Sequence, residues 1–356
     1  MKVLQLIDSL EPGGAERVAV NTANALSKSI DASYLCTTRA EGILKNSLLK
    51  EVNYKFLNKK RTLDIKAFLS IYKYVKKENI TIIHAHSSSF FLATLIKLFN
   101  RKIKIVWHDH YGNSDFLETR KFKTLRLCSV FFNHIITVNT KLEFWAKTNL
   151  KSKFVSYVPN FAVLNNAPST TKLKGVNGKR IVCLANFRPQ KNHLILFEAF
   201  KSINEMYPDW SLHLVGKDFN DSYSESIKNT IQTLGLSQKV FIYGSCEDTF
   251  AILNQCQIGV LASKSEGLPI ALLEYGLAGL ATITTQIGQC ADVVLNQTNG
   301  LVVQPDNVTQ LANAIKYYIE NDNLRLQHGE ALIAHVETFF SEKAIIEKIK
   351  SIYNTL

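Results

Sequence analysis

The feature that most constrains this chain is a repeated alternation of short β-branched runs with segments whose apolar residues recur at helical spacing. This alternation is typical of βαβ units and of parallel sheets. It stops once, over residues 159–178, where Asn, Pro, Gly, Ser and Thr predict a linker between domains. The 356 residues are enough for two such domains.

The sequence therefore predicts an α/β protein with two Rossmann-like, doubly wound parallel-sheet domains. We expect the first over residues 1–165 and the second over residues 166–340, with a C-terminal helix at about 341–356 that packs back on the first. Open parallel sheets bind ligands beyond the carboxyl ends of their strands. Because polar and glycine residues follow the predicted strands in both halves, we expect a ligand in a cleft between the domains. The predicted elements that flank the polar and glycine residues include a strand over 80–84 and helices over 117–131 and 269–278.

Composition excludes several classes of protein. Hydrophobic residues make up 46% of the chain and charged residues 20%, which is typical of soluble globular proteins. The longest apolar runs, residues 90–99 and 127–138, are interrupted by charged or polar residues and are shorter than the ~20 residues that span a bilayer. The first residues show no secretory cleavage site, and the six cysteines show no C-x-x-C spacing. We therefore expect a cytoplasmic protein without disulfides or zinc.

The excess of positive over negative charge lies entirely in the first half of the chain. Residues 1–165 carry 26 Lys and Arg against 12 Asp and Glu, a net charge of +14, whereas residues 166–356 carry 16 against 18, a net charge of −2. Such asymmetry indicates a polyanionic partner, either nucleic acid or anionic lipid, although a basic proteome background is an alternative. The basic clusters, at residues 59–61, 101–104 and 120–126, lack the context of a nucleic-acid module.

We therefore expect no nucleic acid as partner. We expect the basic half to bind the anionic inner face of a membrane through residues such as Lys121, Lys123 and Arg126. Phe122 and Leu125 lie among them on one predicted helix. These two apolar side chains favour either a shallow membrane contact or packing in the core.

Two groups of glycines follow predicted strands. Gly13 and Gly14 stand between the first strand and an amphipathic helix, where glycine lets backbone amides approach a ligand and a helix N-terminus attracts phosphate. A plain tight turn is the alternative. Gly216 occupies an equivalent place in the second half.

A pair of glutamates marks the second half. Glu266 is predicted in a strand-to-helix loop with Gly267, Leu268 and Pro269, and Glu274 in the helix that follows. Two carboxylates so placed can each accept hydrogen bonds from a vicinal diol of sugar or ribose. The alternative interpretation is that one glutamate only interacts with the positive end of the helix dipole and that the other is an ordinary surface residue.

Cations and histidines complete the candidate site. Arg188 and Lys191 follow the first strand of the second half, and together they could neutralise the charge of a diphosphate. The alternative is that both are ordinary basic residues of a solvated loop. His110 could donate a hydrogen bond or carry a proton near neutral pH. With His84 and His86 it could instead suggest a metal site, but no fixed helix spacing supports one. The chain has no Asp-x-Asp, so we expect no divalent ion held by paired aspartates.

Together these motifs resemble the retaining glycosyltransferases of family 4, which share the GT-B fold of two Rossmann-like domains facing a cleft. The resemblance covers essentially the whole chain and rests on G-G-A-E-R at 13–17, on the E-x7-E spacing with E-G-x-P at 266–274, and on the later glycine turn at 288–292. This sequence departs from the family pattern at Asn186, where arginine is common, and at Gln289 and Asp292.

The resemblance implies a role for each residue. It assigns His110 and Glu266 to the transferred sugar as the catalytic pair and Glu274 to the nucleotide ribose. Arg188 and Lys191 would form the pyrophosphate clamp. The other donor-binding residues would be Gly13, Gly14, Gly216, Gly267, Leu268 and Pro269.

The implied activity is transfer of a sugar from a nucleotide-diphosphate sugar, UDP-linked, to a saccharide or lipid-linked saccharide in surface polysaccharide or glycan synthesis. The first domain would take the acceptor and the second the donor, without a metal or other cofactor. Two other functions stay open: a nucleotide-sugar epimerase of the same fold, and a non-catalytic nucleotide-sugar-binding protein.

Overall fold

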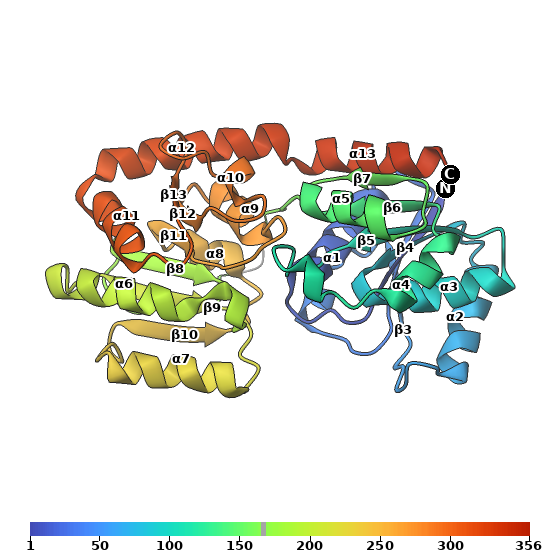
Figure 1. The fold of residues 1–356 in the computed structure, drawn as a ribbon, viewed down its shortest axis with the longest axis horizontal. Coiled ribbons are helices and arrows are strands. Elements are labelled where there is room, and N and C mark those ends of the chain that lie inside the picture. The colour runs from blue at the N-terminus through green and yellow to red at the C-terminus, as the bar shows by residue number, and fades with distance from the viewer. Residues whose placement is uncertain (165–168) are drawn as a thin grey trace. The chain divides into compact units, whose positions relative to one another are not determined.

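The computed structural model describes residues 1–164 and 169–356 (Figure 1). The chain divides into two compact units. Unit 1 comprises Met1–Phe161 and Glu342–Leu356, and unit 2 comprises Ala162–Ser341. The expected domain boundary between residues 165 and 166, and part of the expected linker, lie outside the described residues.

Unit 1 contains a seven-stranded sheet with the order β3-β2-β1-β4-β5-β6-β7, in which all neighbouring strands are parallel. The order reverses between β1 and β4, which is the kind of switch point where open sheets bind ligands. The strands are β1 (Lys2–Ile7), β2 (Ala32–Thr37), β3 (Val52–Phe56), β4 (Ile82–His86), β5 (Lys104–Asp109), β6 (His134–Thr137) and β7 (Val155–Tyr157).

Helices pack on the sheet of unit 1 through separate hydrophobic clusters. One cluster joins the sheet to α2 (Ile65–Lys77), α3 (Phe90–Phe99), α4 (Lys123–Cys128) and α5 (Thr140–Asn149). Another joins it to α1 (Gly14–Ser27) and α13 (Glu342–Asn354). Apolar residues of α13, such as Ile345 and Ile349, lie against Val3, Ile82 and Val106 of the strands, so the end of the chain belongs to the core of unit 1.

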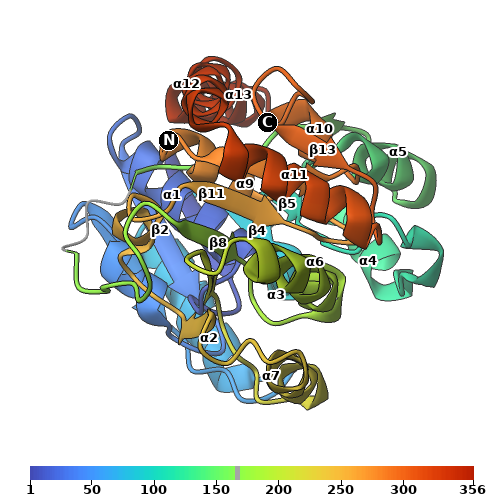
Figure 2. The same ribbon diagram turned by 90° about the vertical axis from the view of Figure 1, so that its left-hand side faces the viewer.

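Unit 2 contains a six-stranded parallel sheet with the order β10-β9-β8-β11-β12-β13. Its strands are β8 (Arg180–Leu184), β9 (Ser211–Val215), β10 (Val240–Gly244), β11 (Ile258–Leu261), β12 (Ala281–Thr285) and β13 (Leu301–Val303). Its helices are α6 (His193–Met206), α7 (Ser222–Thr233), α8 (Thr249–Leu253), α9 (Ile270–Leu277), α10 (Cys290–Val293), α11 (Val308–Glu320) and α12 (Asp322–Phe339). Helices α6 and α11 lie side by side (Figure 2), and α9 packs against α12.

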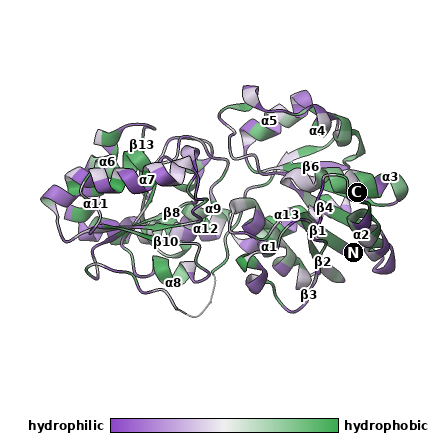
Figure 3. Cartoon of the chain, turned by 90° about the horizontal axis from the view of Figure 1, so that it is seen from below, coloured by the Kyte–Doolittle hydropathy of each residue, from purple (hydrophilic) through white to green (hydrophobic). Residues whose placement is uncertain are grey.

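The predicted α/β architecture with two doubly wound parallel sheets is confirmed. Apolar residues gather along the strands and on the inner helix faces, and hydrophilic residues on the outer faces (Figure 3). All six cysteines are free. None of the helices in the described residues has the length and apolar character needed to cross a membrane.

Three predicted elements are wrong in their bounds. The strand expected over 80–84 is β4, two residues later, because Ile80 still closes the turn after α2 by donating its N–H to the Val75 carbonyl. The helix expected over 117–131 is three short pieces: a 3-10 turn at Leu117–Thr119, α4, and a 3-10 turn at Ser129–Phe131. Pro269 does not open α9 from within but caps it, and the helix begins at Ile270.

Candidate functional site

A cavity of about 1030 Å³ lies beside the carboxyl ends of β4 and β5 in unit 1. It is lined by Ser87 and Ser88 after β4, by residues 109–112 at the end of β5, and by residues 119–125, with Phe90 and Trp107 as apolar walls. His110, the histidine assigned to the sugar by sequence, is one of the lining residues. The cavity therefore places His110 where a ligand of unit 1 can reach it.

An ion pair holds one wall of this cavity. The guanidinium of Arg120 donates hydrogen bonds to both carboxylate oxygens of Asp109 at 2.7 and 2.8 Å, and both side chains are buried. The same guanidinium lies 4.4 Å from the ring centre of Tyr111 and 4.2 Å from that of Trp145. Its inclusion in the basic membrane cluster is therefore wrong, because the charge of Arg120 is neutralised by Asp109 and not offered to a surface.

Of the two uses that the sequence leaves open for Phe122 and Leu125, the structure shows packing in the core. Leu125 is 5% exposed and Phe122 packs against Trp145, so both belong to the core. The exposed apolar side chains nearby are instead Leu127 and Val130, which are 74% and 64% exposed.

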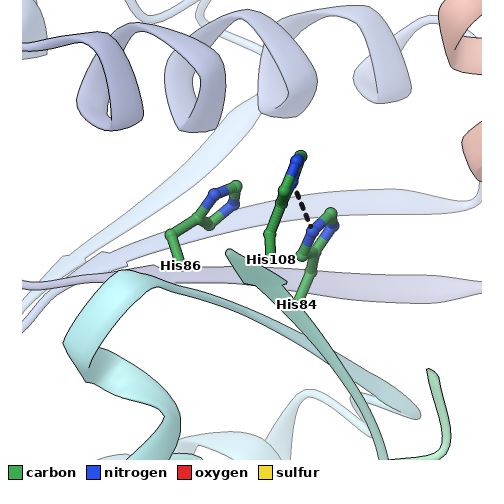
Figure 4. A group of neighbouring side chains, drawn as sticks. All are labelled: His84, His86 and His108. Atoms are coloured by element: carbon green, nitrogen blue, oxygen red, sulfur yellow. Dashed lines mark hydrogen bonds between the residues drawn. The ribbon is translucent and has the colours of Figure 1, made fainter. Parts of the chain in front are cut away.

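Four histidines form a stacked group next to this cavity. His84 and His86 both lie within β4, which ends at residue 86, two residues later than the predicted strand. His108 lies in β5 and His110 follows it, and alternate positions of a strand share one face of a sheet. Figure 4 shows the rings of His84, His86 and His108 side by side. His110 completes the group, with its ring centre 4.0 Å from that of His108.

Two hydrogen-bonded pairs connect the rings. Nε2 of His84 lies 3.2 Å from Nδ1 of His108, and Nδ1 of His86 lies 2.9 Å from Nε2 of His110. Burial lowers the pKa of His110 and of His84 to about 3, and it holds the pKa of His86 and of His108 well below the usual value. The rings are therefore neutral near pH 7, so His110 acts there by hydrogen bonding and not as a proton carrier.

The histidine group does not suit a metal ion. His84, His86 and His108 bring ring nitrogens within 4.8 Å of one another, a set that differs from the predicted one by containing His108 in place of His110. However, the three rings are nearly parallel, with interplanar angles of 13° to 31°. The lone pair of an imidazole lies in the plane of its ring, so nearly parallel neighbours cannot all point at one ion.

In unit 2, a buried ion pair joins two of the candidate residues. Lys191 follows β8 and Glu266 follows β11, and these strands are neighbours at the switch point of the sheet. Nζ of Lys191 donates to Oε1 of Glu266 at 2.5 Å, and the hydroxyl of Ser263 donates to the same oxygen at 2.6 Å. The Glu266 side chain is 7% exposed and that of Lys191 is 20% exposed. The Glu266 carboxylate is thus shielded from water, whereas the Lys191 ammonium remains partly accessible to a ligand.

Glycines hold the loop of Glu266 in place. Gly288 has a left-handed backbone with φ of +46°, and a Cβ there would lie 2.2 Å from the carbonyl oxygen of Glu266. The amide of Gln289 donates to the carbonyl of Gly267 at 2.9 Å. The turn at residue 288 therefore packs directly on the backbone of residues 266–267, which requires glycine.

Glu274 lies half-buried on α9, beyond the buried residues Leu268 and Pro269. Its neighbour Tyr275 is fully buried, and the Tyr275 hydroxyl accepts a hydrogen bond from the amide of Leu184 on β8 at 2.7 Å. This contact anchors α9 to β8 and so fixes the position of Glu274 in unit 2.

The other predicted residues lie at loops and helix ends. Arg188 is exposed, with its guanidinium 4.4 Å from the ring centre of Phe219, and it is not part of the Lys191–Glu266 pair. A Cβ on Gly216 would lie 2.1 Å from the carbonyl oxygen of Ala185, so β8 and β9 approach closely there. In unit 1, Gly13 caps α1 and Gly14 is its first residue.

The sequence analysis missed three side chains that complete these sites: Ser263, Asp109 as the partner of Arg120, and Gln5, which bonds to His86. A signal existed only for Gln5, a polar residue inside the apolar first strand. The contacts of Ser263 and Asp109 depend on side-chain positions that the sequence pattern does not give.

Comparison with solved structures shows the class of fold. HepE of Anabaena, solved in complex with UDP and glucose, matches all of this chain and all of its own at 18% identity with a TM-score of 0.83. The chain has the GT-B glycosyltransferase fold.

Comparison with families and curated relatives then shows the family. A model described as "Glycosyl transferases group 1" matches residues 170–334, and one described as "Glycosyltransferase Family 4" matches residues 12–164. An uncharacterised glycosyltransferase of Haemophilus influenzae is 26% identical over 96% of both chains. The UDP-Gal:alpha-D-GlcNAc-diphosphoundecaprenol alpha-1,3-galactosyltransferase of Escherichia coli is 26% identical over 96% of this chain and 93% of its own. The chain belongs to the family 4 glycosyltransferases, as its motifs suggested.

Proposed function

We propose that this glycosyltransferase is a retaining enzyme that moves a sugar from a UDP-linked donor to a saccharide or lipid-linked saccharide acceptor in surface polysaccharide or glycan synthesis. The observation that carries the proposal is the buried Lys191–Glu266 pair at the carboxyl ends of β8 and β11. HepE, solved with UDP and glucose, supports the donor. The Escherichia coli relative, named for UDP-Gal and a diphosphoundecaprenol acceptor, supports both ligands.

Lys191 stabilises the leaving diphosphate. A lysine ammonium has three N–H donors, and Glu266 takes one of them. The other two can be aimed at developing negative charge in a largely dry site, where a fixed charge stabilises a transition state most. Arg188, an exposed residue three positions before Lys191, supplies a second cation. With these two cations in place of a divalent ion, transfer proceeds without metal.

The carboxylates bind hydroxyls. Glu266, already bonded to Lys191 and Ser263, acts by accepting hydrogen bonds and not as a covalent nucleophile. The acceptor hydroxyl therefore attacks C1 of the sugar on the face that the diphosphate leaves, through an oxocarbenium-like transition state. The bond from C1 to the diphosphate oxygen breaks, and the hydroxyl proton passes to the departing diphosphate. Glu274 accepts hydrogen bonds from the nucleotide ribose, and neutral His110 bonds to the sugar.

Unit 1 binds the acceptor, and its basic surface binds an anionic membrane. Lys121 and Lys123 are exposed and line the cavity that contains His110. Arg126, Leu127 and Val130 are exposed on and just after α4. Cationic side chains next to exposed apolar ones are the pattern of proteins that lie on an anionic lipid surface, where a lipid-linked acceptor would be found.

A thermal-shift screen against UDP-, GDP- and ADP-sugars tests the donor. A ligand at 100 times its dissociation constant stabilises a protein by about 2.7 kcal/mol, so a true donor gives a clear shift. We expect a UDP-sugar to shift the melting temperature most. Incubation with UDP-GlcNAc and no acceptor then separates transfer from isomerisation, because an epimerised nucleotide sugar as product would show an epimerase instead.

A further inference from the structure

We infer that Gln5 and His86 are positioning residues that hold His110 in a single tautomer, with the proton on Nε2 and the lone pair of Nδ1 presented to a ligand. His110 would thereby select a hydrogen-bond donor, such as a hydroxyl, at its end of the cavity. The tautomer follows from unit 1 alone. That the hydroxyl belongs to a sugar rests on the proposed function.

The proton positions follow from a chain of hydrogen bonds that begins at β1. Oε1 of Gln5 lies 2.8 Å from Nε2 of His86, and an amide oxygen can only accept, so Nε2 of His86 carries the proton. A neutral imidazole has one N–H, which makes Nδ1 of His86 an acceptor. Nε2 of His110 lies 2.9 Å from that atom and must donate to it. The proton of His110 is thus on Nε2, and Nδ1 is the nitrogen left for a ligand.

Burial keeps this chain neutral and rigid. Gln5 and His86 are 0% exposed, so a second proton on the His86 ring would be a buried charge and would set its Nδ1–H against the Nε2–H of His110. Burial accordingly lowers the pKa of His110 to about 3. The ring of His108 lies against His110 with centres 4.0 Å apart, which fixes the plane of the ring. The direction of the Nδ1 lone pair is therefore set before a ligand arrives.

An acceptor nitrogen in this position discriminates between ligand groups. A hydroxyl or amide can donate to Nδ1, whereas a phosphate or carboxylate oxygen would meet it lone pair to lone pair. The anionic part of a ligand is better matched by Lys121 and Lys123, which also line this cavity. The cavity thus offers an acceptor nitrogen for a hydroxyl and two cations for a negative charge.

Nitrogen NMR of the full-length protein labelled with ¹⁵N-histidine tests the tautomer without any substrate. His110→Asn identifies the signals of His110 by their loss. We expect the wild-type His110 to be protonated on Nε2 and unprotonated on Nδ1 at pH 7.5. A proton on Nδ1, or rapid averaging between the two tautomers, would overturn the inference.

Two variants test the cause. Gln5→Met removes the acceptor with little change in side-chain length and should release His110 into a mixture of tautomers. His134→Gln is the control, because it changes another buried histidine of unit 1, which bonds to Ser156 and not to the stacked group. It should leave the His110 signals unchanged. An unchanged His110 tautomer in Gln5→Met would also overturn the inference.

Kinetics tests the consequence. With the donor found by the thermal-shift screen, the wild-type enzyme should discriminate against one deoxy-sugar analogue. Gln5→Met should reduce that discrimination about 2- to 10-fold, as expected for one net hydrogen bond. Equal discrimination in both proteins would contradict the selection of a hydroxyl. Because the NMR result needs no activity, failure of the proposed function would leave it intact and would be recognised separately.

Discussion

Removal of the Lys191 charge should destabilise unit 2 and abolish transfer, and the two effects should be separable. Lys191→Met keeps an aliphatic side chain of similar length but leaves the Glu266 carboxylate buried with Ser263 as the remaining donor among the bonds described above. Glu266→Gln in the same chain removes the buried charge while its amide can still accept from Ser263. The double variant should therefore regain stability without regaining activity.

The size of the effect follows from the burial of the pair. Breaking a fully buried ion pair costs about 3–5 kcal/mol. Here the Lys191 side chain is 20% exposed and Ser263 still donates to Glu266, so we expect a smaller loss of about 2 kcal/mol. For a unit of this size, that corresponds to a fall of about 4–8 °C in melting temperature.

Calorimetry and a transfer assay on three variants give the answer. Lys201→Met is the control, since Lys201 forms an exposed pair with Glu205 in the same unit and should change stability by less than about 0.5 kcal/mol. A double variant no more stable than Lys191→Met would show that an unpaired buried charge on Glu266 is not what destabilises the single variant. Full transfer activity in Lys191→Met would refute the assignment of Lys191 to the leaving diphosphate.

Four further predictions concern the nucleotide, the metal, pH and the membrane. Glu274→Ala should weaken nucleotide binding by about 2–4 kcal/mol through loss of two charge-assisted hydrogen bonds; calorimetric titration showing unchanged affinity would remove Glu274 from the site. Transfer should survive exhaustive EDTA treatment, and a complete loss that magnesium or manganese restores would show that Arg188 and Lys191 do not replace a metal. Burial lowers the pKa of His84 and His110 to about 3 from the ordinary 6.5, so the unfolded chain binds more protons than the folded one below pH 6.5. Each histidine should therefore lower the free energy of unfolding of unit 1 by up to about 1.4 kcal/mol for each pH unit from pH 6.5 down to pH 3. Denaturation measurements in which this stability falls equally steeply with pH in wild type and His84→Asn would contradict those values. Charge reversal at Lys121, Lys123 and Arg126 should reduce co-sedimentation with anionic vesicles at low salt, and equal binding to neutral and anionic vesicles would leave the basic half of the chain without a membrane role.

Local patterns were sufficient to predict the architecture and much of the donor loop. The strands of both sheets show β-branched runs that need no long-range information, and the E-x7-E spacing marks the loop and helix that carry Glu266 and Glu274. Lys191 and Glu266 each follow a strand, and β8 and β11 prove to be neighbours, so a sequence argument about strand ends already places them at one edge.

The rest depends on contacts that a local pattern does not contain. The apolar run before His84 fits a helix end as well as a strand start, so the bounds of β4 were shifted by two residues. Arg120 looked like one of several basic residues, and only the fold brings it to Asp109. Gln5 and His86 are 81 residues apart, and His84 meets Tyr353 across 269 residues, so the histidine network could not be predicted from spacing.

Unit 1 and unit 2 thus offer complementary chemistry on a shared type of scaffold. Unit 2 provides a buried cation–carboxylate pair at the switch point of its sheet, suited to a diphosphate and a sugar hydroxyl. Unit 1 provides a cavity with a neutral histidine and exposed lysines, suited to a second ligand with both hydroxyls and negative charge.

The central claim, that this chain is a retaining glycosyltransferase, is tested most directly by proton NMR of the transfer reaction while it proceeds. The UDP-sugar selected by thermal shift is mixed with the enzyme and a diphospholipid-linked saccharide, and the anomeric signal of the first product is observed. We expect free UDP to appear together with a glycoside of the same anomeric configuration as the donor. A product of inverted configuration, or an epimerised nucleotide sugar with no release of UDP, would contradict the account.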